Sequence, residues 1–177
     1  MTNLEKVQFL YNTQNVTKND VYEYVKSNTI TKEDYKTIIG EDCLELPLEA
    51  VIQNKVQELE IKCLSIISNG FDSNCLGDTE HFDSTQNDIG FIQGLASKAS
   101  LIKSGMQLED NTLDWKASDE PVCHTFTPDQ MIALGVDLST FMTTNIKKKE
   151  QLQAYVKTLT KAEDVQGVTW DTQIPTT

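Results

Sequence analysis

Hydrophobic positions in residues 1–40 recur at helical spacing in three short runs separated by polar residues. Thr17 stands where it can cap the second run, and residues 31–34 (Thr-Lys-Glu-Asp) resemble the capping box that opens many helices. The third run stops at Gly40, a residue preferred just beyond a helix end. The pattern predicts three short helices. The apolar positions of the first two are Leu4, Val7, Leu10, Tyr11, Val21, Tyr24 and Val25.

An acidic joint at residues 41–47 follows these helices. About forty residues bury little surface by themselves, so we expect this unit to pack against a partner or against the rest of the chain. The sequence is therefore divided into a small helical docking unit at 1–43, a helical domain with short hairpins at 44–170, and a loose tail at 171–177.

A long helix is predicted from Leu48 to Asn69, ended by Asn69-Gly70. Its apolar positions are spaced four, three, four and three residues apart, which is heptad spacing carried for just over two heptads. Two interpretations stay open: a core-facing amphipathic helix, or the seam of an oligomer. The positions are Ile52, Val56, Leu59, Cys63 and Ile66.

Residues 71–83 have the alternation and turn chemistry of a β-hairpin, with the turn at 76–78 (Leu-Gly-Asp). Ser84 is predicted to cap the next helix, which runs to about Lys103 and is followed by Gly105. The residues expected to face inward from this helix are Ile89, Ile92, Leu95, Ala96 and Ala99.

A second β-like pair is predicted at 112–116 and 122–126. Residues 127–130 (Thr-Pro-Asp-Gln) combine an N-cap, a proline at the first helical position and a third-position glutamine, which together predict the start of a helix. This helix should reach about Leu159, with a bend at Gly135, and a β-like stretch at 168–170 should follow. The expected fold is α+β and mostly α, with the two long helices packed antiparallel around helix 84–103.

The charge of the chain argues against nucleic acid as a partner. Fifteen cationic residues, all lysine, face 27 acidic residues, for a formal net charge of −12 and a pI near 4.5. Affinity for nucleic acid rests on neutralising phosphates, and arginine is their usual bidentate ligand. The codon bias of an AT-rich genome also accounts for the absence of arginine.

No apolar stretch approaches the 18 to 20 or so residues of a spanning helix, and residues 1–5 lack the basic and apolar regions of a signal peptide. We therefore expect synthesis in the host cytoplasm and no membrane association. Four cysteines without a C-x-x-C pair are expected to be reduced thiols, and Cys63 lies on an apolar stripe, which indicates packing. The four are Cys43, Cys63, Cys75 and Cys123.

Candidate chemistry is sparse. His81 lies among acidic residues that can be drawn as a metal cage, but a Ca²⁺ loop starting at Asp72 fails at Leu76 and lacks the closing glutamate. Cys123 and His124 are adjacent in a predicted strand, so their side chains point to opposite faces and form no nucleophile–base pair. The sequence predicts no catalytic residue, no cofactor and no metal.

Two segments resemble known phage families. Residues 7–43, with Thr17-Lys18-Asn19-Asp20-Val21, Ile30-Thr31-Lys32-Glu33-Asp34-Tyr35-Lys36 and Ile39-Gly40-Glu41, resemble the short XkdX family of phage-tail proteins. Residues from about 49 to 170 are similar to an uncharacterised domain family found on phage tail-fibre and fibre-assembly proteins. The matching segments there are His81-Phe82-Asp83-Ser84, Asp114-Trp115-Lys116, Phe126-Thr127-Pro128-Asp129-Gln130 and Val168-Thr169-Trp170.

These resemblances imply a non-enzymatic structural protein of a phage or phage-tail-like particle, in the baseplate or near the fibre. Its expected partners are other tail, baseplate or fibre subunits and other copies of itself. Two alternatives stay open: an assembly factor absent from the mature particle, and, less favoured, an enzyme acting on the cell wall.

The candidate interface residues come from the first unit, from the long helix and from the two tryptophans. Each tryptophan either fills a core or seam, or anchors an interface. The candidates are Tyr24, Tyr35, Ile52, Val56, Leu59, Ile66, Trp115 and Trp170.

Overall fold

The computed structural model describes residues 1–43 and 47–175, and residues 44–46 and 176–177 lie outside the described part. The middle of the predicted acidic joint and the last two residues of the predicted tail therefore fall outside it. The chain divides into two compact units, Met1–Pro47 and Leu48–Thr177. The described residues form seven helices and two small antiparallel hairpins, which confirms the prediction of a mostly helical α+β fold.

The first unit contains the three predicted short helices, α1 (Asn3–Asn12), α2 (Lys18–Lys26) and α3 (Lys32–Ile39). Each begins with a capping box, in which a threonine hydroxyl accepts from the third helical N–H and an acidic side chain accepts from the threonine N–H. Gly40 ends α3 with a φ of +81°, a left-handed conformation that glycine adopts without a Cβ clash. The buried core of this unit comprises Val7, Val21, Ile30, Tyr35 and Ile38.

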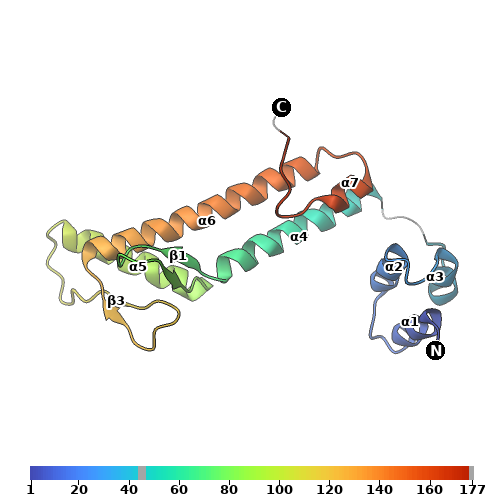
Figure 1. Cartoon of the computed structure of the whole chain (residues 1–177), viewed down its shortest axis with the longest axis horizontal. Coiled ribbons are helices and arrows are strands. Elements are labelled where there is room, and N and C mark those ends of the chain that lie inside the picture. The colour runs from blue at the N-terminus through green and yellow to red at the C-terminus, as the bar shows by residue number, and fades with distance from the viewer. Residues whose placement is uncertain (44–46, 176–177) are drawn as a thin grey trace. The chain divides into compact units, whose positions relative to one another are not determined.

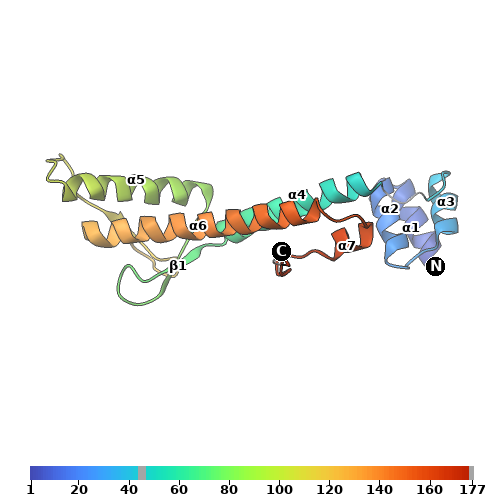
Figure 2. The same cartoon turned by 90° about the horizontal axis from the view of Figure 1, so that it is seen from above.

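The second unit is built on the long helix α6 (Pro128–Val156). Helix α4 (Leu48–Ser68) runs antiparallel to one half of α6, and α5 (Gln86–Lys103) runs antiparallel to the other half (Figures 1 and 2). The predicted antiparallel packing of the two long helices is confirmed, but they do not pack around α5, which lies along a different half of α6 from α4. The hairpin between α4 and α5 also packs on α6, and it separates the two helices along the length of α6.

The buried face of α4 follows a row with a constant spacing of four residues, and the predicted four–three pattern is corrected accordingly. Successive members of such a row are displaced by about 40° around the helix, so the row inclines to the helix axis. The inclined row lets α4 contact two neighbouring helices. It packs on α6 and, near the start of α4, also on α7 (Ala162–Gly167). The row consists of Val51, Lys55, Leu59, Cys63 and Ile67.

Two short antiparallel hairpins flank α5. Strands β1 (Phe71–Ser73) and β2 (Glu80–Phe82) pair with Phe71 opposite Phe82, while β3 (Asp114–Trp115) pairs with β4 (His124–Thr125). Both are shorter than predicted. The cap of α5 is also corrected: Thr85 accepts from the Asp88 N–H, and the predicted cap, Ser84, is buried and donates its hydroxyl to the Ile67 carbonyl of α4.

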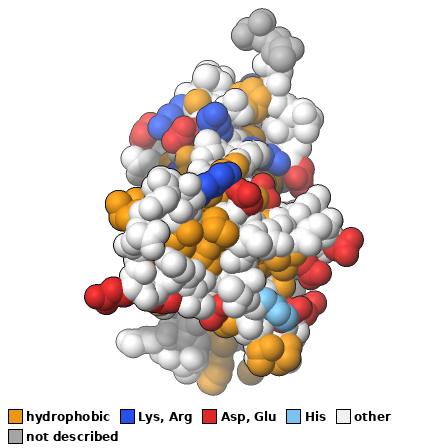
Figure 3. Space-filling view, turned by 90° about the vertical axis from the view of Figure 1, so that its left-hand side faces the viewer, with side chains coloured by type: hydrophobic (Ala, Val, Ile, Leu, Met, Phe, Trp, Pro, Cys, Tyr) orange, Lys and Arg blue, Asp and Glu red, His pale blue; other side chains and the backbone are white. Residues whose placement is uncertain are grey.

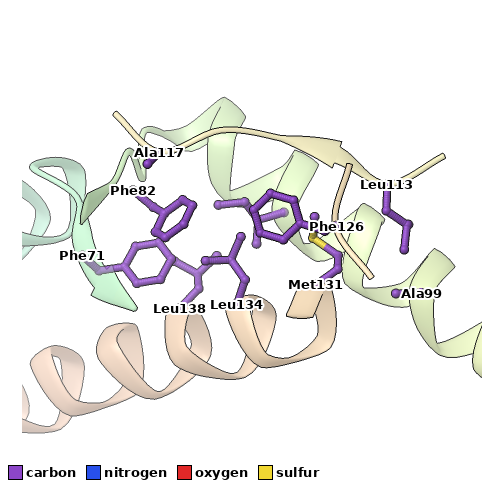
Figure 4. Close-up of a cluster of buried hydrophobic side chains, with 10 residues drawn as sticks. Phe71, Phe82, Ala99, Leu113, Ala117, Phe126, Met131, Leu134 and Leu138 are labelled. Carbon is purple, nitrogen blue, oxygen red and sulfur yellow. The ribbon is translucent and has the colours of Figure 1, made fainter. Parts of the chain in front are cut away.

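The main hydrophobic core lies where both hairpins and α5 meet the first half of α6 (Figure 4). Helix α6 is continuous past Gly135. This glycine lies at a point of close packing, because an added Cβ would lie 2.6 Å from the Ala96 Cβ of α5. The helix ends at Val156, three residues before the predicted end. The core residues are Phe71, Phe82, Ile92, Ala99, Leu113, Ala117, Phe126, Met131, Leu134 and Leu138.

Candidate interaction surfaces

A polar clamp joins α4 to the second half of α6. Gln153 donates from Nε2 to the Val56 carbonyl at 3.0 Å, and Lys149 Nζ lies 2.9 Å from a Glu60 carboxylate oxygen. The hydrogen bond from Lys149 lowers the pKa of Glu60, and the same bond raises the pKa of Lys149. Both groups are therefore charged near neutral pH, which fixes the facing sides of the two helices.

A groove of about 420 Å³ runs beside this clamp, open to solvent between α4 and α6. Two of the predicted interface residues, Ile52 and Val56, are half-buried and form its apolar floor. The rest of its lining is mostly amides and charged groups: Glu49, Gln53, Gln57, Glu60, Gln153 and Lys157.

The other two α4 candidates do not line this groove. Leu59 is 2% exposed and faces the inside of its own chain, so it is a packing residue. Ile66 is half-buried, because the row that packs inward passes through its neighbour Ile67. Cys63 is buried, as its place in the apolar pattern predicted, and burial raises the pKa of its thiol.

In the first unit, the two tyrosine candidates differ in burial. Tyr35 is buried, and its ring packs edge-on against Tyr22 with ring centroids 6.5 Å apart. Burial raises the pKa of the Tyr35 hydroxyl. Tyr24 is half-buried at the edge of the same core. Phe9 of α1, which the sequence reasoning did not single out, is 58% exposed.

Trp115 of β3 is half-buried and packs against Phe91 of α5, with ring centroids 6.1 Å apart. Phe91 is itself 63% exposed, and Val122 of the β3–β4 connection is 61% exposed. Figure 3 views the second unit from this end, where hydrophobic side chains surface in separate patches between acidic, lysine and uncharged groups. Trp115 therefore contributes both to the edge of the core and to the surface.

Trp170 lies in a turn after α7, and the predicted β-like stretch at 168–170 is wrong. The ammonium of Lys148 lies over its ring, 5.2 Å from the centroid, which is a cation–π contact with α6. Residues 171–175 form neither helix nor strand, but the part at 172–175 lines a pocket against the last turns of α6. The preceding Val165 and Val168 are fully or nearly fully buried, whereas four of the five residues at 171–175 are exposed.

The His81 side chain, on strand β2, connects the hairpin to the end of helix α4. Its Nδ1 lies 2.7 Å from an Asp72 carboxylate oxygen across the hairpin, and its Nε2 lies 3.0 Å from the Asn69 carbonyl at the end of α4. The bonds to Asp72 and Asn69 raise the pKa of the imidazole. Over residues 1–43 and 47–175, no group of three or more His, Cys, Asp or Glu side chains is arranged to hold a metal ion.

Sequence reasoning missed the outward face of α4. Ile61 and Leu64 are 60% and 55% exposed and lie one turn apart on the side away from the buried row. The signal was present in the sequence, since Gln57, Ile61, Leu64 and Ser68 have the same four–three–four spacing as the stripe that was chosen.

Matches to two protein families together cover nearly the whole chain. Residues 50–171 match a family described as a domain of unknown function, DUF4376. The chain belongs to the DUF4376 family. Residues 5–42 match a second family, described as a phage uncharacterised protein (Phage_XkdX). The DUF4376 match covers the second unit from within α4 to just beyond Trp170, and the XkdX match runs from within α1 to just beyond α3.

The XkdX match makes this DUF4376 protein phage-associated, as the resemblance of residues 7–43 predicted. No curated protein and no solved structure matches the chain. Across the part of the chain that the structure describes, no helix is both long and apolar enough to cross a membrane.

Proposed function

We propose that this phage-associated DUF4376 protein is a non-enzymatic structural component of a phage tail, located in the baseplate or next to the fibre. It joins other subunits through protein–protein contacts. It is made in the host cytoplasm and incorporated into the particle.

The observation that carries the proposal is the coincidence of a compact structural unit with a separate phage family. Met1–Pro47 has its own core, and the XkdX match at residues 5–42 lies entirely within it. A separate module of this size, attached to a larger domain of another family, is the arrangement expected of a docking unit. Its candidate contacts are Tyr24, at the edge of that core, and the exposed Phe9.

The second unit supports the same role. It exposes large apolar side chains on several elements, among them Ile61, Leu64 and Phe91. Exposed apolar side chains are common one at a time, but groups of them on one face mark surfaces for other proteins. A half-buried tryptophan beside such a group, as Trp115 is beside Phe91, is a typical interface anchor.

The proposal is tested by mass spectrometry of gradient-purified particles from infected or induced cells. A structural component is expected in the particle fraction at a fixed ratio to known tail subunits. Presence in the cells but absence from the particles would support the assembly-factor alternative instead. An enzyme acting on the cell wall would require a carboxylate whose replacement abolishes lysis without removing the particles.

A further inference from the structure

The solvent-facing side of α4 carries a stripe without charge. Its five members are spaced four, four, three and four residues apart, which places them on one face of the helix. All five are exposed, although 24% of the residues of the chain are charged and a solvent face is where such residues normally stand. The members are Gln53, Gln57, Ile61, Leu64 and Ser68.

The groove between α4 and α6 borders this stripe, because Gln53 and Gln57 belong to both. The same helix therefore presents an apolar hollow, floored by Ile52 and Val56, and an apolar projection about two turns further on, formed by Ile61 and Leu64. A surface that carries both halves of a contact fits another copy of itself.

We propose that this face of α4 is where two copies of the chain associate, with the two α4 helices antiparallel about a twofold axis near Glu60. This inference goes beyond the structural role in the tail and does not depend on it. In such a pair, a residue a given number of positions after Glu60 lies at the same level along the helix axis as the residue the same number of positions before Glu60 on the second copy. Leu64 then faces Val56 of the second copy and enters its groove.

The edges of the stripe are consistent with this arrangement. On one edge Glu58 and Lys62 are four residues apart and both exposed. A twofold axis brings the same edge of each helix together, so Lys62 faces Glu58 of the second copy and Glu58 faces its Lys62. On the other edge the two Glu60 carboxylates approach, and each is already paired with Lys149 of its own chain at 2.9 Å.

The absence of charge on the stripe favours a second copy over a cationic partner, because a cationic partner would pair with acidic side chains and the stripe contains none. With a net charge of −12, two copies repel each other over most of their surfaces, and an uncharged face is where they can meet. The stripe extends over about 22 Å at the 1.5 Å rise of a helix. Such a face is smaller than the roughly 800 Å² per partner of a standard interface, so we expect a dissociation constant between about 1 μM and 1 mM.

The proposal is tested on the full purified chain by sedimentation velocity and by light scattering across a concentration series. The wild type is expected to pass from monomer to dimer as its concentration rises. Ile61→Glu with Leu64→Glu should raise the dissociation constant at least about tenfold, because it places unpaired charges in the contact. Both side chains are more than half exposed, so the variant should keep the helical signal and melting temperature of the wild-type monomer. The matched control is Val136→Glu, which charges an exposed apolar position on α6 (57% exposed) and should leave dimer formation unchanged.

A charge exchange tests the antiparallel register. Lys62→Glu should weaken the dimer several-fold, and adding Glu58→Lys should restore it, because the two positions face each other across the twofold axis. Melting temperatures are followed in parallel, since Glu58 also pairs with Lys55 of its own helix at 2.6 Å. A wild-type chain that stays monomeric up to about 1 mM, the weak end of specific association, overturns the proposal. So does a dimer that is unaffected by the Ile61 and Leu64 changes, or an exchange that fails to restore the dimer.

Discussion

At the scale of single residues, His81 shows how one side chain connects two elements. Its two ring nitrogens lie beside a carboxylate oxygen of Asp72 and the carbonyl oxygen of Asn69, and both oxygens are acceptors. A neutral imidazole has one donor, so only the imidazolium can satisfy both partners. Gly70 leaves the space for this ring, because a Cβ at that position would lie 2.3 Å from His81 Nε2.

We predict that replacing His81 by Gln lowers stability most at acidic pH. The pKa of His81 is raised in the folded chain, so its stabilisation is fully present below the unfolded value of about 6.5 and is lost as pH rises through the folded value. The side chain is 46% exposed, so the effect should be within about 1 kcal/mol. Melting temperatures of wild type and His81→Gln, measured from pH 5 to pH 9 or so, should converge as pH rises.

The Asp72→Asn variant provides the control for the His81 experiment. In that background the His81→Gln change should lose much of its pH dependence, since the hydrogen bond to Asp72 is the largest cause of the raised pKa. A difference between wild type and His81→Gln that stays constant over the whole pH range would contradict the imidazolium tie.

Residue-level features were predictable where they depend on near neighbours in the sequence. The caps at Thr17, Thr31 and Thr127 were read correctly, because an N-cap and its helix lie within four residues. Ser84 was misread because its hydroxyl bonds to Ile67 of α4, a contact that only the folded chain creates. The bond between His81 and Asn69 depends in the same way on where the hairpin returns to α4.

At the scale of elements, the register of α4 separates its core face from its surface. The sequence predicted an amphipathic helix with the correct length to within one residue, but of the predicted apolar row only Leu59 and Cys63 belong to the buried row. A four–three pattern assumes a single straight partner, whereas α4 packs on both α6 and α7. The inward row therefore includes Lys55, a residue that a search for apolar positions passes over.

The two aspartate substitutions Leu59→Asp and Val56→Asp should differ sharply. Leu59 is 2% exposed, so a carboxylate there is buried without a partner and should abolish cooperative unfolding. Val56 is half-buried beside an open groove, where the new carboxylate can reach water, so that variant should keep its helical circular dichroism and a melting transition. Equal loss of structure in both variants would show that the groove is part of the core.

Gly135 determines how closely α5 and α6 approach. Gly135→Ala gains helix propensity but forces its Cβ against that of Ala96, so we expect a net loss of about 1–3 kcal/mol in the free energy of unfolding. Gly94→Ala on α5 is the matched control, because nothing lies within 4 Å of its added Cβ and helix propensity alone should make it neutral or slightly stabilising. Urea denaturation measures both. Combining Gly135→Ala with Ala96→Gly should recover part of the loss, and a Gly135→Ala variant as stable as the Gly94→Ala control would contradict the close packing.

At the scale of the whole molecule, the chain combines two compact units that match two different families. The helix count of the first unit and the mostly helical α+β class were predictable, because both rest on local periodicity and on strong caps. The placement of α4 and α5 on successive halves of α6 was not predictable. The hydrophobic period of a helix indicates which face is buried, but not which part of a neighbouring helix that face covers. The helical spacing of Ile61 and Leu64 was present in the sequence, but only the fold shows that this face of α4 is left exposed.

The most direct test of the structural role compares two chains in the same phage. One population of particles is produced with the full chain and another with a chain that begins at Leu48, each expressed to the same level, and both are purified on gradients and analysed by quantitative mass spectrometry. The second unit has its own core, so the truncated chain should fold, which circular dichroism checks. We predict that the full chain is present at a fixed ratio to the tail subunits and that the truncated chain is absent. Absence of the full chain from the particles, or equal incorporation of both chains, would contradict a tail component that docks through its first unit.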